Sequence, residues 1–198
     1  MHTNSKLLFE KYASRYFHSG MKVLEVGPDA FPSSYRKIIA NKHIIWDTLD
    51  IYDSSELTYP NSNLYSFAIA DNEYDIVLSG QVIEHIAKIW RWMPEVARVT
   101  RPHGRVITIS PVSWPYHEAP IDCWRMFPDG MRALCEDSDL RVETSLFESL
   151  ELPTFKRALP GLSAEYQRWS IRLCFRLLGI FGFPVEKSFD TITIAIKG

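Results

Sequence analysis

The sequence predicts an α/β fold, a doubly wound and mostly parallel sheet with helices on both faces. Short apolar segments alternate with helical ones at intervals that suit β-α-β crossovers. Segment 74–79 has the composition of a buried strand, and segment 191–196 alternates polar and apolar residues as a last strand does. With 198 residues, 46% of them hydrophobic, the chain is long enough for a single domain, 1–198, around a sizeable core.

The first half of the chain gives the clearest signals. Residues 5–18 carry apolar and aromatic side chains at helical spacing, and Gly20 ends the helix. Met21–Val26 is an apolar run that ends at Gly27, as a buried strand does. The elements expected next are a helix over 33–40, strands over 43–51, 57–59 and 74–79, and a helix over 88–100.

The second half continues the alternation. Residues 102–104 predict a turn and 105–110 a strand. A helix over 128–137 and a strand over 140–146 follow. The stretch of about 151–187 is too long for a simple loop, so we expect a helical insertion before the last strand.

Charge and cysteine content exclude several classes of protein. The formal net charge is −2, which gives no reason to expect a nucleic-acid partner. Three cysteines without C-x-x-C spacing argue against a disulfide framework or a zinc site. We expect a cytoplasmic protein, because the first ten residues lack the apolar run of a signal peptide and no apolar stretch reaches the length of a membrane span.

The loop after the first strand is where an open α/β sheet binds its ligand. It reads Glu25-Val26-Gly27-Pro28-Asp29, and the second strand ends at Asp50, where a carboxylate can hold a ribose diol. A dinucleotide needs several glycines beside its pyrophosphate, and Asp29 would repel that group. S-adenosylmethionine has a sulfonium and an ammonium group instead, so this acidic loop favours S-adenosylmethionine as the cofactor.

Five motifs in order resemble those of the class I S-adenosylmethionine-dependent methyltransferases, type 11 branch. They are Glu25–Pro28, Asp50, Tyr74–Ser79, Val82–Ile86 and Val96–Gly104. The resemblance extends over about residues 21–111 and implies a Rossmann-like sheet of seven strands. Two residues depart from the pattern, because Asp29 replaces the usual second glycine and His103 stands where many relatives have glycine.

The resemblance also implies a set of cofactor-binding residues. Glu25 and Gly27, with Pro28 beside them, are expected at the methionine end, and Asp50 at the ribose. The residues expected toward the sulfonium are Ser79, Gly80 and Gln81, and Asn63 is expected near the adenine.

The segment 111–128 is expected on the substrate side of the sheet edge. It concentrates aromatic and charged residues between prolines, and aromatic faces can stack on a sugar ring. The candidate acceptor-binding residues are Trp114, Tyr116, Trp124 and Arg125. A small molecule or carbohydrate is therefore the expected partner.

Methyl transfer to a hydroxyl benefits from a nearby base. His117 is the first candidate because imidazole titrates near neutral pH, and His85 is the second. Asp122 can act as the base or orient His117. No Asp and His residues show the spacing of a magnesium site, so no metal is expected.

Residues 166–183 predict an amphipathic helix, because Arg168, Arg172 and Arg176 recur every four residues and share one face. Packing of this helix on the sheet is the favoured interpretation. A lid, a dimer contact and contact with an anionic membrane surface are the less favoured ones.

The sequence thus predicts a methyltransferase that acts on a small acceptor, most simply by O-methylation of a sugar, glycan precursor or secondary metabolite. Two alternatives stay open. One is a NAD-dependent reductase, and the other is a non-catalytic binding protein that keeps the fold.

Overall fold

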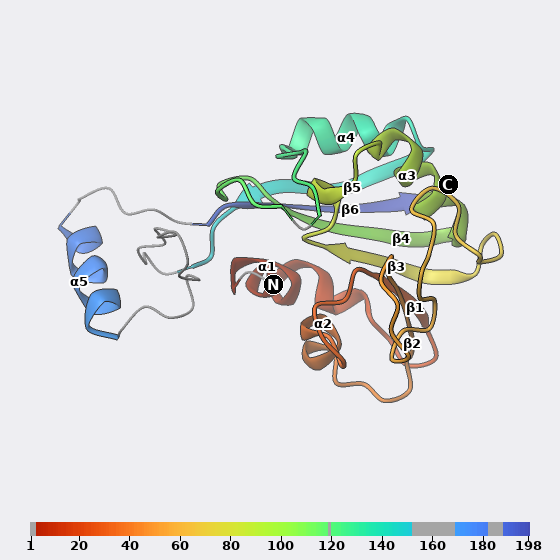
Figure 1. The fold of residues 1–198 in the computed structure, drawn as a ribbon, viewed down its shortest axis with the longest axis horizontal. Helices are drawn as coiled ribbons and strands as arrows, with labels where there is room; N and C mark the ends of the chain where they lie inside the picture. The colour runs from red at the N-terminus through yellow and green to blue at the C-terminus, as the bar shows by residue number, and fades with distance from the viewer. Residues whose placement is uncertain (1–2, 119, 152–168, 182–187) are drawn as a thin grey trace.

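A computed structural model of the protein describes residues 3–118, 120–151, 169–181 and 188–198 (Figure 1). Its centre is one sheet with the strand order β2-β1-β3-β4-β6-β5. The strands are β1 (Lys22–Val26), β2 (Ile45–Leu49), β3 (Tyr74–Gly80), β4 (Thr100–Pro111), β5 (Leu140–Glu148) and β6 (Asp190–Lys197).

The sheet is mostly parallel, as predicted. The pairs β1–β2, β1–β3 and β3–β4 are parallel, whereas β6 runs antiparallel to both β4 and β5. The order of the strands reverses at β1, which has the later strand β3 on one side and β2 on the other. Ligands of open α/β sheets bind at such a switch point.

The described residues form six strands, not the seven that were expected. Residues 57–59 were predicted as a strand but form only one bridge, between Leu49 and Tyr59. The Thr58 hydroxyl accepts from the backbone N–H of Thr48, and the Thr48 hydroxyl accepts from that of Thr58. Backbone bonds join the segments only around Tyr59, whose N–H donates to the Thr48 carbonyl and whose carbonyl accepts from Asp50 N–H. The side-chain bonds satisfy the groups beside them, and Pro60 supplies no N–H to continue the pairing.

The helical elements cover both faces of the sheet. In Figure 1, α3 and α4 lie on one face, and α1 and α2 on the other. The elements are α1 (Thr3–Leu8), the π-helical turn Phe9–Ala13, the 3-10 turn Ser14–Tyr16, α2 (Ser34–Ile38), the 3-10 turn Ile83–His85, α3 (Ile89–Val99), α4 (Pro128–Glu136) and α5 (Trp169–Ile180).

Each face of the sheet has its own buried core. Trp92 and Met93 of α3 are fully buried against one face. Phe9, after α1, and Tyr35 of α2 are fully buried against the other. Both cores reach the strand β3, and all residues of β3 are buried. Burial on both faces explains why most residues of segment 74–80 are apolar, without the alternation of a half-buried strand.

The helix starts follow local chemistry. Ser33 caps α2, because its hydroxyl accepts from the backbone N–H of Arg36 at 3.0 Å. The predicted first helix is present over 3–16 but changes its hydrogen-bonding pattern along its length. Pro128 begins α4 at the first helical turn, where its missing N–H costs nothing.

The predicted insertion is described in part. Its helix α5 exposes Trp169, Leu173, Leu177 and Ile180 along one side. Arg168 and the side chains of Arg172 and Arg176 lie outside the described residues, so the arginine face stays a prediction. Among the helices described, none is long and apolar enough to cross a membrane.

The predicted turn at 102–104 lies inside a strand. Thr100 of β4 pairs with Tyr74 of β3, and the next pair joins Arg105 to Ile76, so four residues of β4 bulge out opposite one residue of β3. Arg101 forms an ion pair with Asp75 across this bulge. His103 has a φ of 62°, in the left-handed region.

We expect His103→Gly to stabilise the protein, because glycine adopts a positive φ without the steric cost that a Cβ imposes, which is on the order of 1 kcal/mol. The His103 side chain is exposed, so its removal loses little packing. Chemical denaturation should give a higher free energy of unfolding for His103→Gly than for the wild type. His103→Ala is the control, since it keeps the Cβ and should show no gain. Equal stability of the Gly and Ala variants would contradict the assignment of strain to this residue.

Candidate functional site

A cavity of about 310 Å³ opens at the carboxyl ends of β1, β2 and β3. Gly27, Asp50 and Gln81 directly follow these three parallel strands, so they meet at one edge of the sheet. The other lining residues are Val26, Leu49, Ile51, Tyr52, Leu64, Val82, His85, Ile86, Pro120 and Ile121. The lining is mainly apolar with a few convergent polar groups, as in sites for small ligands.

The turn after β1 depends on glycine. Gly27 has a φ of 73°, and its N–H donates to the carbonyl of Leu49 at 2.9 Å. A Cβ at this position would overlap Cγ2 of Val82. Gly27 therefore brings the backbone of the loop into close contact with the segment that follows β3, and Pro28 continues the turn.

Asp29, which departs from the family pattern, is directed to the start of α2. Its Oδ1 accepts from the backbone N–H of Ser34 at 2.8 Å, and its Oδ2 accepts from the Ser34 hydroxyl at 2.6 Å. Hydrogen bonds from Ser34 lower its pKa against the opposing effect of burial. The residue thus serves the helix start, and Gly27 alone makes the turn.

Glu25 lies beneath this turn and is not among the residues that line the cavity. Its side chain is buried, and Oε2 accepts from the Ser33 hydroxyl at 2.5 Å and from Nε1 of Trp46 at 2.8 Å. The second oxygen, Oε1, is buried without a hydrogen-bond partner. Burial raises the pKa of Glu25 to about 7, although the two hydrogen bonds oppose the shift.

Asp50 lines the cavity as expected of a ribose ligand. Its Oδ1 accepts from the backbone N–H of Ile51 at 2.6 Å, and partial burial raises its pKa. Asn63, predicted near the adenine, is exposed and lies outside the lining residues, where Oδ1 accepts from Tyr65 N–H. Its neighbour Leu64 lines the cavity in its place.

The residues after β3 differ in their access to the cavity. Ser79 is 3% exposed and does not line it. Gly80 allows the Tyr35 ring to approach, because a Cβ there would overlap the Tyr35 hydroxyl. Gln81 does line the cavity, with a φ of 61°, and its amide contacts the Ser5 hydroxyl at 3.4 Å and Oδ1 of Asp190 at 3.1 Å.

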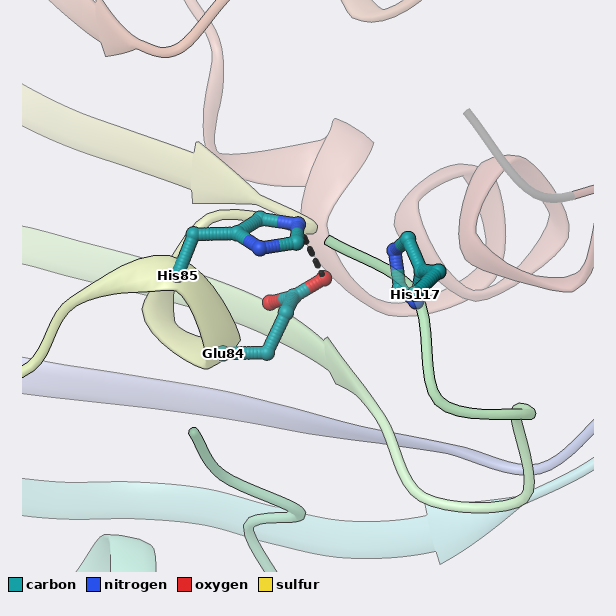
Figure 2. Close-up of side chains that lie close together, drawn as sticks. All are labelled: Glu84, His85 and His117. Atoms are coloured by element: carbon teal, nitrogen blue, oxygen red, sulfur yellow. Dashed lines mark ion pairs between the residues drawn. The ribbon is translucent and has the colours of Figure 1, made fainter. Parts of the chain in front are cut away.

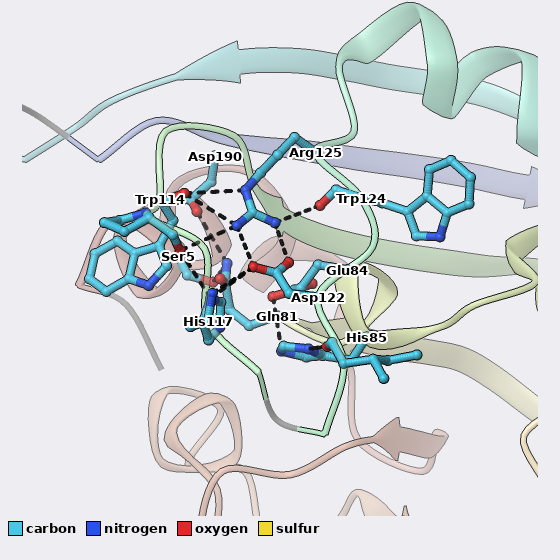
Figure 3. Close-up of polar contacts among 12 residues, drawn as sticks. Ser5, Gln81, Glu84, His85, Trp114, His117, Asp122, Trp124, Arg125 and Asp190 are labelled. Carbon is cyan, nitrogen blue, oxygen red and sulfur yellow. Dashed lines mark hydrogen bonds and ion pairs between the residues drawn. The ribbon is translucent and has the colours of Figure 1, made fainter.

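The loop after β4 is fixed by an ion pair (Figure 3). Arg125 donates to Oδ1 of Asp122 at 2.5 Å and to Oδ2 at 2.7 Å, and it also reaches the carbonyls of Trp114 and Pro115. The Arg125 guanidinium holds the pKa of Asp122 well below its usual range. Asp122 is therefore a poor base, and its geometry fits the alternative of orienting His117.

Two of the four predicted acceptor ligands are occupied by these structural contacts. Arg125 is committed to Asp122, and Trp124 donates from Nε1 to the carbonyl of Ile86 at 2.8 Å. Tyr116 is 72% exposed and donates to Glu118, and the Trp114 side chain is partly exposed. None of the four predicted acceptor ligands is among the residues that line the cavity.

Glu84, His85 and His117 come together in a group that spacing along the sequence did not predict (Figure 2). One ligand atom of each lies within 4.8 Å of the others. Burial raises the pKa of Glu84 to about 8 and lowers the pKa of His117. Glu84 and His85 are adjacent in the sequence, but His117 is 32 positions after His85, so only the fold joins them.

Comparison with known proteins relates the chain to methyltransferases. A family model described as a methyltransferase domain matches residues 37–108. Over this segment the chain is similar to methyltransferase domains. The matched segment contains Asp50, β3 and the Glu84–His85 pair, which are parts of the site described above.

The chain is similar in sequence to curated bacterial relatives over part of its length. It is 32% identical over 101 residues to an uncharacterized methyltransferase of Mycobacteroides abscessus. The alignment covers 48% of this chain and 34% of that relative, so the chain spans only about a third of the relative's length.

Solved structures share the methyltransferase fold at low identity. An S-adenosylmethionine-dependent methyltransferase of Archaeoglobus fulgidus matches with a TM-score of 0.64 and 15% identity, over 97% of this chain and 92% of that one. A phosphoethanolamine N-methyltransferase 2 of Haemonchus contortus, solved with S-adenosyl-L-methionine, matches with a TM-score of 0.61 and 12% identity, over 98% of this chain and 52% of that one. These matches show that the chain has the fold of these methyltransferases.

We expect Gly27→Ala to weaken binding of S-adenosylhomocysteine by tenfold or more, because the added methyl group overlaps Val82 and the residue keeps a positive φ. Isothermal titration calorimetry measures this. Gly20→Ala is the matched control, since Gly20 has a φ of 86° but nothing within 4 Å of its Cβ position. Both variants should lose stability, and only Gly27→Ala should lose affinity. Equal affinities in the two variants would exclude Gly27 from the binding turn.

Proposed function

We propose that this protein transfers a methyl group from S-adenosylmethionine to an oxygen of a small acceptor, such as a sugar, a glycan precursor or a secondary metabolite. The observation that carries the proposal is the single cavity in which Gly27, Asp50 and Gln81 meet His85. It has a donor end at the strand ends and an acceptor end at the loop after β4.

The donor end suits a cationic ligand. Asp50 can accept hydrogen bonds from the ribose diol, and the buried Glu25 has one oxygen without a partner beneath the Gly27 turn. Both groups are acidic, whereas the loop offers only one glycine to a pyrophosphate. The sulfonium and ammonium groups of S-adenosylmethionine match this charge.

The acceptor end combines apolar walls with groups that handle a proton. Pro120 and Ile121 line the cavity, and Trp114 and Tyr116 belong to the same loop. His85 lines the cavity, and the rings of His85 and His117 are 5.1 Å apart. We therefore assign deprotonation of the acceptor hydroxyl to this histidine pair, with His117 as the first candidate and Asp122 as the residue that positions it.

The transfer itself is an in-line displacement at carbon. The carbon–sulfur bond breaks with its electron pair left on sulfur, and the acceptor oxygen forms the new bond to the methyl carbon. The protein's contribution is to align the two reactants and exclude water. A cytoplasmic location is part of this proposal, and it is supported by three cysteines that are all free.

The decisive test measures donor binding and methyl transfer separately. Wild-type protein should bind S-adenosylhomocysteine and not NAD, and it should transfer label from methyl-labelled S-adenosylmethionine to a member of a panel of sugars and nucleotide sugars.

We expect Asp50→Asn to weaken the binding of S-adenosylhomocysteine by about 10- to 100-fold, since hydrogen bonds to charged groups contribute about 1.5–3 kcal/mol.

Asp53→Asn is the matched control, because Asp53 is an exposed carboxylate just after β2 that does not line the cavity. Binding without any labelled product would favour the non-catalytic alternative. Unchanged affinity in Asp50→Asn would remove the ribose assignment.

Donor binding should also depend on pH through Glu25. The carboxyl must lose its proton to attract the donor's ammonium group, and its pKa is about 7. Affinity for S-adenosylhomocysteine should therefore increase from pH 5.5 to pH 7, by about tenfold per pH unit at the lower end of the range. In this window the ligand's amino group stays protonated, with a pKa of about 8. Glu25→Gln should flatten the dependence, and an unchanged slope in that variant would exclude Glu25 as its source.

A further inference from the structure

We propose that Glu84, His85 and His117 form a binding site for one divalent transition-metal ion. The first two residues belong to the 3-10 turn after β3, and the third belongs to the loop after β4. Their ligand atoms lie within 4.8 Å of one another (Figure 2). Two imidazoles and a carboxylate are a common ligand set for zinc and other first-row metals.

Glu84 supplies the strongest argument. Its side chain is 1% exposed, and neither carboxylate oxygen has a hydrogen-bond partner. Nε2 of His85 lies 3.8 Å from Oε1, which is beyond hydrogen-bond length. Burying a carboxylate without hydrogen-bond partners is costly, and a cation bound to it would offset that cost.

The two histidines are prepared for the same role. Nδ1 of His85 is hydrogen-bonded to the carbonyl of Ile121. Nδ1 of His117 lies 3.3 Å from the carbonyl of Pro115 and 3.4 Å from Oδ2 of Asp122. Such contacts hold the proton on Nδ1 and leave the Nε2 lone pair available, which is how histidine ligands of metals are usually supported.

The positive charge that Glu84 feels is hydrogen-bonded elsewhere. Arg125 interacts electrostatically with Glu84, but its guanidinium donates to both oxygens of Asp122 and to neither oxygen of Glu84 (Figure 3). Gln81, also drawn there, has a buried Oε1 without a hydrogen-bond partner. Metal–ligand bonds of about 2.0–2.2 Å place neighbouring ligand atoms roughly 3.5 Å apart, so the three side chains need to close by about 1 Å.

The role of the ion rests on the proposed function. Three protein ligands leave at least one position open, and His85 connects the site to the cavity. An acceptor hydroxyl that binds there loses its proton to solvent more readily, because a divalent ion lowers the pKa of a bound O–H group. The oxygen then takes the methyl group, and the sulfonium becomes a neutral thioether. In the metal-bound state the two histidines would promote this deprotonation through the ion that they hold, in place of the direct role as base that the proposed function gives them.

The test begins with protein stripped of metal by a chelator and titrated with Co²⁺, Zn²⁺ or Mn²⁺ in a calorimeter, with the visible spectrum of Co²⁺ recorded in parallel. One ion per chain should bind. Glu84→Gln, His85→Ala and His117→Ala should each weaken binding by 100-fold or more. His18→Ala and His43→Ala, which remove exposed histidines elsewhere, are the matched controls and should bind like the wild type.

His117→Cys gives a spectroscopic check. It should retain Co²⁺ and gain an intense absorption from thiolate-to-metal charge transfer. Because His117 is in a surface loop, its variants test the site even where Glu84→Gln fails to fold. Absence of binding by the wild type, or undiminished binding in the His117 and His85 variants, would overturn the proposal.

Failure of this inference can be told from failure of the proposed function. Affinity for S-adenosylhomocysteine is measured on the same stripped protein and should be unchanged in His117→Ala, because His117 does not line the cavity. Full methyl transfer by stripped protein that binds no ion would refute the metal site alone and return His117 to the role of base. Ion binding at the three residues without any methyl transfer would refute the proposed function and leave the site in place.

Discussion

Close approach of two chain segments at the ends of β1 and β3 is the constraint on which the rest of the site depends. A Cβ at Gly27 would overlap Val82, and a Cβ at Gly80 would overlap the Tyr35 hydroxyl. The absence of a side chain at these two positions allows the segments to pack closely. These contacts position α2 and the 3-10 turn after β3 relative to the sheet. A larger residue at either position would separate the elements that carry Asp50, Gln81 and His85.

The close packing also explains the electrostatic character of the site. Glu25 lies near the end of β1 and Glu84 lies within the 3-10 turn after β3, and both are about 1% exposed. Burial favours their neutral forms, so each has a pKa near or above neutrality. A cationic ligand near either group recovers the interaction that burial removed, which makes this edge of the sheet selective for positive charge.

Much of the fold was predictable from local sequence. Continuous apolar runs marked β1 and β3 because both faces of those strands are covered, and Ser33 and Pro128 marked two helix starts by their capping chemistry. The expected third strand at 57–59 was wrong, since reciprocal Thr48–Thr58 bonds are not visible in an apolarity pattern. The residues of the bulge at 101–104 predicted a turn, but nothing in the sequence indicated that this turn lies inside a strand.

The site was predictable only where its residues follow strand ends in order. Gly27, Asp50 and Gln81 obey that rule, and the structure brings them to one cavity. No such rule predicts that Glu84 and His85 lie beside His117. His117 is in an irregular loop, and the path of that loop cannot be derived from the sequence pattern. The ion pair of Asp122 with Arg125 was not predicted, because the sequence analysis assigned Arg125 to the acceptor. Its role in holding the loop follows from the bonds of Arg125 to the carbonyls of Trp114 and Pro115.

Gln81 gives the N-terminal segment a part in the thermodynamics of the site. One face of this residue lines the cavity, while its amide holds Ser5 of α1 and Asp190 of β6, and Asp190 also accepts from the side chain of Asn4. Occupancy of the cavity and docking of α1 therefore share a residue. A ligand that binds more tightly when Gln81 is held in place therefore stabilises the packing of the first helix on the sheet. By reciprocity, loosening that helix lowers the affinity for the ligand by the same factor.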